Sequence, residues 1–245
     1  MRNKNQSTLK NSTVLEFFGL PGAGKTTVLN CLQHQLKNKN IRFVSNEDIH
    51  VWLVSKSLMF KIRLLIKYLA YSLSVYAQFI AEAGFRHFFK PPFLRRTTDF
   101  ISSSLYLKEY LSRHKYDICL LDQWGLQFIW SAWIGLKQPE KRFLICAIKK
   151  MQQKYPRTYV YYETSAQIAA DRITQRTHGN SRFENLNTAT VKKMMTSGQK
   201  LFNNILEAAE KANTDILILN AQNTPEENAS MIIEQLQKST NVSNY

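Results

Sequence analysis

The chain has 245 residues, 44% of them hydrophobic, and a formal net charge of +15 at pH 7. This length can bury a substantial core, and because no Gly-, Ser- or Pro-rich linker or internal repeat divides the sequence, we expect one domain. The polar start has no apolar signal segment, and Cys31, Cys119 and Cys146 are odd in number without metal-type spacing, which argues against export and disulfides and predicts a cytoplasmic protein.

Apolar patterning predicts an α/β fold. Residues 1–12 are polar and predict a loose tail, whereas residues 13–240 alternate short β-rich runs with longer helical patterns. This alternation is typical of a parallel sheet with right-handed helical crossovers. The expected strands are 14–18, 41–45, 116–122, 158–164 and 215–220. The runs at 118–121 and 215–219 are almost continuously apolar, which predicts strands covered on both faces.

The first strand leads into a glycine-rich loop, GLPGAGKTT, at residues 19–27. It fits the Walker A spacing, in which strand, loop and helix follow one another. Gly19, Gly22 and Gly24 let successive N–H groups point at phosphate oxygens, and the helix that follows adds its positive end. Lys25 would reach the β- and γ-phosphates, and the Thr26 hydroxyl would bind Mg²⁺. The sequence therefore predicts a P-loop that binds a nucleotide.

The segment 52–115 predicts helices that are interrupted at Pro91-Pro92. Basic residues greatly outnumber acidic ones there, which leaves open a nucleic acid, an anionic membrane surface or a polyanionic acceptor as the partner. We favour the acceptor, and expect no specific nucleic acid and at most weak peripheral membrane contact.

The uncharged run 68–81 is shorter than the ~18 residues of a spanning helix and predicts a buried helix. Aromatic residues of this segment either join the core, which we favour, or line an acceptor pocket. They are Tyr68, Tyr71, Tyr76, Phe85, Phe88 and Phe89.

Two further patterns predict catalytic groups. The apolar run 118–121 ends in Asp122, as in a Walker B strand, and this carboxylate would hold Mg²⁺, accept a proton or simply cap the strand. The segment 164–186 places Arg172, Arg176 and Arg182 around a Gly-Asn-Ser turn. Such arginines would close over phosphoryl oxygens as a lid over residues 172–186, unless they form a solvated helix end.

These motifs resemble the thymidylate kinase group of nucleoside and nucleoside monophosphate kinases. The resemblance rests on GLPGAGKTT, the acid-ended third strand, YVYYETSAQIAADRITQRTHGNSRFENL and the closing ILILNAQNTPEENASMIIEQL. It implies a P-loop NTPase fold with a five-stranded parallel sheet in the order 2-3-1-4-5 and an arginine-rich lid. It also implies ATP and Mg²⁺, with residues 19–27, including Ala23 and Thr27, on the phosphates, and the loop after Asn220 near adenine.

The chain departs from that group where the acceptor binds. Gln123 and Trp124 follow Asp122 where the family has an arginine, and Ser45-Asn46-Glu47-Asp48 replaces a Glu-Pro-Gly-type segment. We therefore predict a kinase that transfers the γ-phosphoryl group of ATP to a nucleoside, nucleotide or other small acceptor, with Asp122 or Asp48 as the base. The alternative is a P-loop NTPase that switches a partner or a membrane-associated state. Whether the protein forms a homodimer is left open by the sequence.

Overall fold

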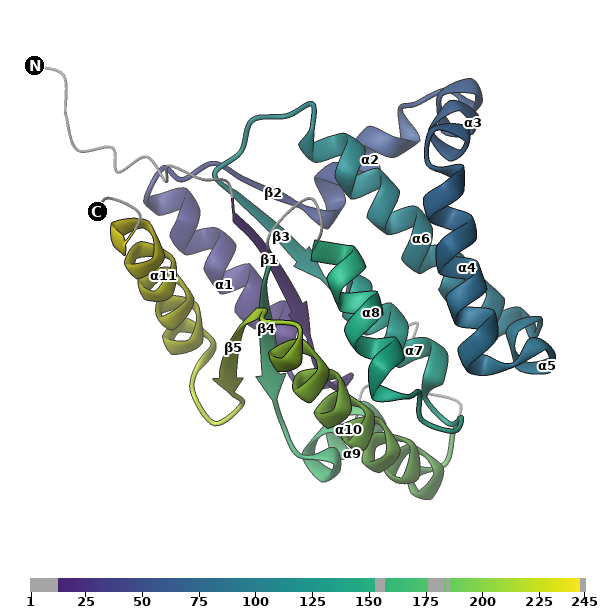
Figure 1. Cartoon of the computed structure of the whole chain (residues 1–245). Coiled ribbons are helices and arrows are strands. Elements are labelled where there is room, and N and C mark those ends of the chain that lie inside the picture. Colours follow the sequence, from purple (N-terminus) through teal and green to yellow (C-terminus); the bar gives the residue numbers. More distant parts are fainter. Residues whose placement is uncertain (1–12, 153–156, 176–182, 184–185, 243–245) are drawn as a thin grey trace, which may run out of the picture.

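The structure of the chain, a computed structural model, describes residues 13–152, 157–175, 183 and 186–242. Five parallel strands form one sheet in the order β2-β3-β1-β4-β5, with helices on both faces (Figure 1). The predicted P-loop fold with the order 2-3-1-4-5 is therefore confirmed. The expected tail at 1–12 lies outside the described residues.

The elements follow one another as β1 (Thr13–Phe18), α1 (Lys25–Asn38), β2 (Phe43–Ser45), α2 (Asn46–Val54), α3 (Leu58–Lys67), α4 (Leu69–Ala83), α5 (Phe85–Phe88), α6 (Pro91–Leu111), β3 (Ile118–Asp122), α7 (Gly125–Trp133), α8 (Lys141–Gln152), β4 (Arg157–Glu163), α9 (Ala166–Thr174), α10 (Thr188–Lys211), β5 (Asp215–Asn220) and α11 (Pro225–Val242).

Strand periodicity divides the core into two layers. Successive strand residues point to opposite faces, so Phe17 packs toward α1 and α11, whereas Phe18 packs toward α7 and α10. Both side chains are fully buried. In Figure 1, α1 and α11 cover one face of the sheet, and α8 and α10 lie across the other. The P-loop between β1 and α1 is thereby held at the carboxyl edge of the central strand.

The expectation that the run 215–219 is covered on both faces is wrong. In β5 only Leu219 is buried, and Ile218 is 52% exposed. The reason is position, because β5 is an edge strand that pairs only with β4. The run 118–121, in β3 between β1 and β2, is buried throughout as predicted.

Between β2 and β3 the chain forms the helices α2 to α6. Pro91 and Pro92 occupy the first turn of α6, where a missing N–H costs nothing. The prediction that 68–81 is a buried helix is only partly right. In α4 Val75 and Phe79 enter the core, whereas Leu73 is exposed, so the helix is buried on one side.

Candidate phosphate-binding and acceptor site

The loop after β1 has a backbone that requires glycine. Gly19 has φ +146° and Gly22 has φ +82°, values that L-residues with a side chain rarely adopt. A Cβ atom on Gly19 would lie 2.7 Å from the Tyr162 carbonyl oxygen, and one on Gly22 would lie 2.8 Å from that of Ala169. The predicted loop glycines thus allow the backbone to press against β4 and α9.

Lys25 begins α1, and its side chain folds back over the loop. It is 4% exposed, and its Nζ donates hydrogen bonds to the carbonyl oxygens of Gly19 (2.9 Å) and Leu20 (3.0 Å). These two carbonyl oxygens hold the ammonium group over the loop. The charge therefore lies beside the open end of α1, where helix N–H groups already favour an anion. This is the arrangement that binds phosphates.

The two predicted Mg²⁺ ligands lie together. The Thr26 Oγ1 donates to Asp122 Oδ2 at 3.1 Å. The other carboxylate oxygen, Oδ1, is buried and has no hydrogen-bond partner among the described residues. Burial raises the pKa of Asp122, and the charge of Lys25 and the Thr26 hydrogen bond counteract only part of that rise. A half-buried carboxylate with a buried, unpaired oxygen beside a hydroxyl fits the oxygen-ligand preference of Mg²⁺.

Two residues that the sequence did not single out hold this centre in place. The Asn46 amide accepts from the Asp122 backbone N–H at 3.2 Å and donates to its carbonyl oxygen. On the other side, the buried Gln127 side chain accepts from the Gly19 N–H at 3.3 Å. The loop and the acid are therefore braced by α2 and α7.

A buried ion pair fixes α7. Glu16 of β1 is fully buried, and its Oε1 accepts from the Leu126 N–H at 2.7 Å, while its Oε2 accepts from Arg157 Nη1 of β4 at 2.7 Å. A buried charge is tolerated when it is paired and hydrogen-bonded in this way. The pair therefore ties the first turn of α7, and with it Gln127, to the strand that carries the P-loop.

A cavity of about 650 Å³ opens next to this centre, between α2, α6 and α7. It is lined by Asn46, Glu47, Ile49, His50, Val51, Leu53, Asp99, Ser102, Ser103, Tyr106, Trp124 and Phe128. Asn46 belongs both to its wall and to the contact with Asp122. Lysine and arginine are missing from the wall, as far as the described part of the chain extends. The cavity therefore offers aromatic surface, hydroxyls and carboxylates.

The two neighbouring acids of α2 have different surroundings. Asp48 accepts from the Ser45 N–H (2.7 Å) and Ser45 Oγ (2.8 Å), completing a capping box. Glu47 lines the cavity. The predicted base Asp48 is thus engaged in closing the first turn of α2, whereas its neighbour Glu47 is the one that lines the cavity. The two acids are adjacent at the start of α2, so their spacing in the sequence cannot show which of them closes the cap and which lines the cavity.

The other predicted residues lie around the loop. Arg172 of α9 donates through Nη1 to the Ala23 carbonyl oxygen at 2.9 Å, whereas Arg176 and Arg182 fall outside the described residues. Thr27 is exposed on α1. Asn220 accepts from the Gln222 N–H at 2.8 Å and shapes the turn after β5. The structure thus groups Gly19 to Thr27, Asp122 and Arg172, and places Asn220 at the carboxyl end of β5.

Comparison with known proteins adds little to this geometry. No protein-family profile and no curated protein matches the sequence. Among solved structures, the chain is similar to a deoxyadenosine kinase from M. mycoides with the products dCMP and a flexible dCDP bound, at 13% identity and a TM-score of 0.49, over 92% of this chain and 100% of that one. The sheet order and the loop after β1 define the fold of this chain by themselves.

Proposed function

We propose that this protein is an ATP- and Mg²⁺-dependent kinase of a small molecule that carries a hydroxyl group. The observation that supports it most is the meeting of Lys25, Thr26 and Asp122 beside a cavity walled by Trp124 and Glu47. A nucleotide switch would need the first three residues but not a cavity with aromatic walls. The cavity therefore favours the kinase over the alternative of an NTPase module.

Each residue would have a defined task in transfer. The loop N–H groups and Lys25 would bind the β- and γ-phosphates and stabilise charge that develops on them. Thr26 and Asp122 would hold Mg²⁺, which neutralises phosphate charge when bound. Arg172, already held against the loop at Ala23, would fix its shape while ATP binds. Most of the catalytic effect would come from positioning and electrostatics.

The base that receives the hydroxyl proton is, in this proposal, Glu47. Asp122 would hold Mg²⁺ together with Thr26, and Asp48 closes the capping box with Ser45, so both carboxylates already have another task. Glu47 lines the cavity in which the acceptor would lie. A carboxylate in reach of the hydroxyl contributes about 10²- to 10⁴-fold as a general base.

The residues of the cavity wall also limit the chemical class of the acceptor. Glu47 and Asp99 line it without a lysine or arginine among its described lining residues, and Asp99 is paired with Arg96 at 3.4 Å, so a bound phosphate would meet the negative charge of Glu47. Trp124 and Phe128 offer flat apolar faces instead. We therefore propose an unphosphorylated hydroxyl compound with a flat or apolar part, and expect thymidine monophosphate to be a poor acceptor.

The test is a product screen. The protein is incubated with ATP, Mg²⁺ and pools of nucleosides, nucleotides and sugars, and mass spectrometry detects any compound that gains one phosphoryl group. Glu47→Gln should lower the transfer rate by about 10²-fold or more. Asp48→Asn is the matched control, which should cost about 1 kcal/mol of stability through the cap and leave the rate nearly unchanged. The reverse order of effects would assign the base to Asp48, and saturable turnover of thymidine monophosphate would refute the acceptor class.

A further inference from the structure

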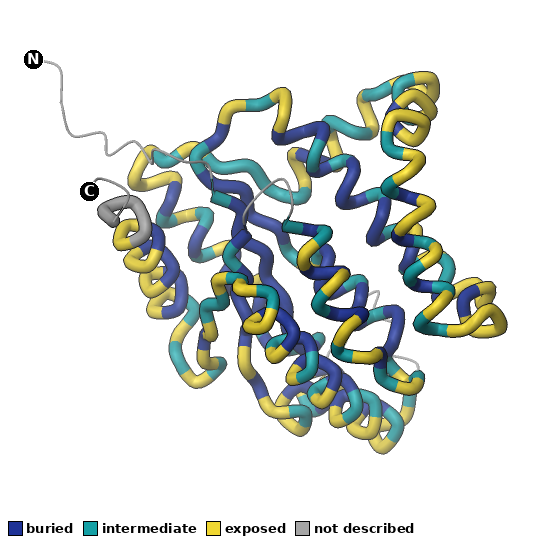
Figure 2. Tube along the Cα trace, in the orientation of Figure 1, coloured by how far each residue is buried: buried dark blue, intermediate teal, exposed yellow. Residues whose placement is uncertain are grey.

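The helices α3 and α4 present apolar side chains to solvent. Within α3 the exposed residues recur at helical spacing, and Figure 2 shows exposed residues along most of α3 at one corner of the molecule. We call them the α3–α4 stripe: Leu58, Met59, Ile62, Leu65, Ile66, Leu69 and Leu73, with exposures of 73, 59, 42, 46, 67, 53 and 58%. Scattered exposed apolar residues are ordinary, but a continuous stripe marks an interaction surface.

The charged residues next to this stripe in the sequence are all basic. Lys56, Lys61, Arg63 and Lys67 are the charged residues between 51 and 73, a segment without aspartate or glutamate. Lys61 and Arg63 form no ion pair with any residue that the structure describes. An apolar helix face bordered by unpaired cations is the pattern of helices that lie at the interface of an anionic membrane.

The two helices are fixed to the domain on their inner side. In α4, Val75 and Phe79 are 1% exposed, and Phe79 packs on Phe100 and Trp133 in the core. Among the described residues no single helix is long and apolar enough to cross a membrane, and the combination of α3 with α4 that meets those requirements is bent by 70°. Inserting α4 across a bilayer would remove Phe79 from the core. The stripe can instead contact a membrane surface from outside.

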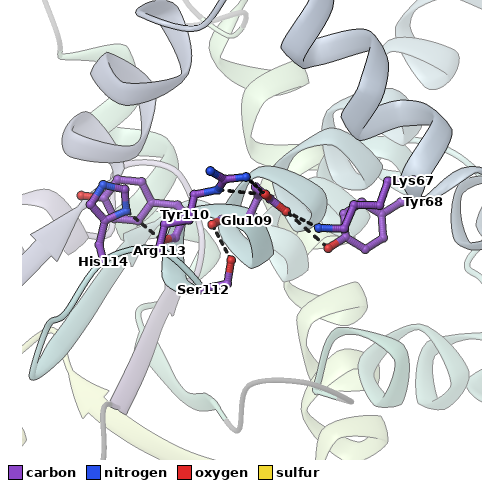
Figure 3. Close-up of polar contacts among 7 residues, drawn as sticks. All are labelled: Lys67, Tyr68, Glu109, Tyr110, Ser112, Arg113 and His114. Carbon is purple, nitrogen blue, oxygen red and sulfur yellow. Dashed lines mark hydrogen bonds and ion pairs between the residues drawn. The ribbon is translucent and has the colours of Figure 1, made fainter.

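An ion-pair cluster holds α3 in this position (Figure 3). The buried Glu109 of α6 accepts from Lys67 Nζ at 2.9 Å and from Arg113 Nε at 2.9 Å, with the Tyr68 hydroxyl at 3.5 Å. Burial opposes ionisation of Glu109, but the hydrogen bonds from Arg113 and Lys67 outweigh it and lower its pKa. The end of α3 is therefore anchored to α6, with the stripe facing outward.

From this surface we propose that the α3–α4 stripe docks the protein on an anionic phospholipid surface. The apolar side chains would enter the boundary between headgroups and acyl chains, and Lys61 and Arg63 would contact lipid phosphates. Charge argues against a second copy as the occupant. In a twofold dimer the same patch meets itself, so these cations would oppose each other in a chain that already carries +15.

Vesicle flotation with the full chain and no nucleotide tests the proposal independently of the kinase. The vesicles are phosphatidylcholine with or without phosphatidylserine, at low salt and at about 0.15 M salt. We expect binding only to the anionic vesicles, weaker at the higher salt. Lys61→Gln with Arg63→Gln should weaken it about 25-fold, at about fivefold per charge. Leu58→Ser with Ile66→Ser should weaken it about tenfold or more.

Matched controls lie on other helices. Lys192→Gln with Lys193→Gln on α10 removes two exposed cations, and Met231→Ser on α11 removes an exposed apolar side chain; binding should persist in both. Thermal unfolding verifies that all variants fold. Equal binding to neutral vesicles, no binding at all, or equal losses in the control variants would overturn the proposal. The proposal would also be overturned if sedimentation showed a dimer of the wild-type protein and a monomer of the variant with Leu58→Ser and Ile66→Ser.

Discussion

Replacing Asp122 by Asn should change stability and activity in opposite directions. The Asp122 Oδ1 is buried without a partner among the described residues, and burial raises the pKa of this carboxyl group. An unpaired buried polar group costs about 1–3 kcal/mol. Asn keeps an unpaired polar atom at that place but removes the charge, and an unpaired buried charge costs more than an unpaired neutral group, so the variant without ligand should gain about 1 kcal/mol at neutral pH.

The pH dependence follows from the direction of the shift. A raised pKa in the folded state means that protonated Asp122 favours folding, so this contribution is full below the ordinary value of 3.8 and is lost as pH rises through the folded-state pKa. The advantage of Asp122→Asn should therefore be largest at neutral pH and disappear toward pH 3.8. Denaturant unfolding at the two pH values measures it.

Phosphoryl transfer by the same variant should fall about 10²- to 10⁴-fold, because a Mg²⁺ ligand is lost. Stabilisation of the protein by ATP and Mg²⁺ should shrink as well. An Asp122→Asn protein that is less stable than wild type at neutral pH, yet transfers phosphate normally, would show that the acid only caps β3. The reasoning from its buried oxygen would then be wrong.

Three further outcomes are expected. Glu16→Gln should lower the unfolding free energy by about 3–5 kcal/mol, because it leaves Arg157 buried without its counter-charge, and Glu16→Met with Arg157→Met should recover much of that loss in denaturant unfolding; equal loss in both would contradict the pairing. Arg172→Ala should lower the maximal transfer rate about 10- to 100-fold through a displaced loop while thermal stability changes little, and a loss of stability alone would make its contact structural. Thiol alkylation of the native protein should modify the exposed Cys146 but not Cys119, because burial raises the pKa of Cys119 to about 12. Mass spectrometry identifies the labelled cysteine, and labelling of Cys119 before Cys146 would contradict the burial of Cys119.

The sheet and the loop could be predicted from the sequence because their signals are local. Gly19, Gly22 and Gly24 occupy backbone conformations that glycine alone adopts easily, and apolar runs mark each strand within two residues of its observed ends. The central and edge strands look alike in sequence. The run 215–219 is as apolar as 118–121. Ile218 is exposed because β5 lies at the edge of the sheet, with β4 as its single neighbour.

The surroundings of the site were missed because they join distant segments. Gln127 contacts Gly19 across 108 positions of the sequence, and Asn46 contacts Asp122 across 76. No motif or spacing of Gln or Asn predicts contacts of this kind. The choice between Glu47 and Asp48 depends on which of two adjacent side chains closes the capping box. Whether an apolar helix face is covered is likewise a tertiary property, so the periodicity of 58–73 did not distinguish an inward stripe from an outward one.

The central claim is that Lys25 and its loop hold ATP for transfer to a hydroxyl compound. The most direct measurement follows ATP labelled on its γ-phosphoryl group, with Mg²⁺ and the acceptor found in the product screen, in wild type and in Lys25→Ala. The label should appear on the acceptor hydroxyl with wild type and be almost absent with Lys25→Ala, although both proteins fold. Label found only in inorganic phosphate, or equal transfer by Lys25→Ala, would contradict the account.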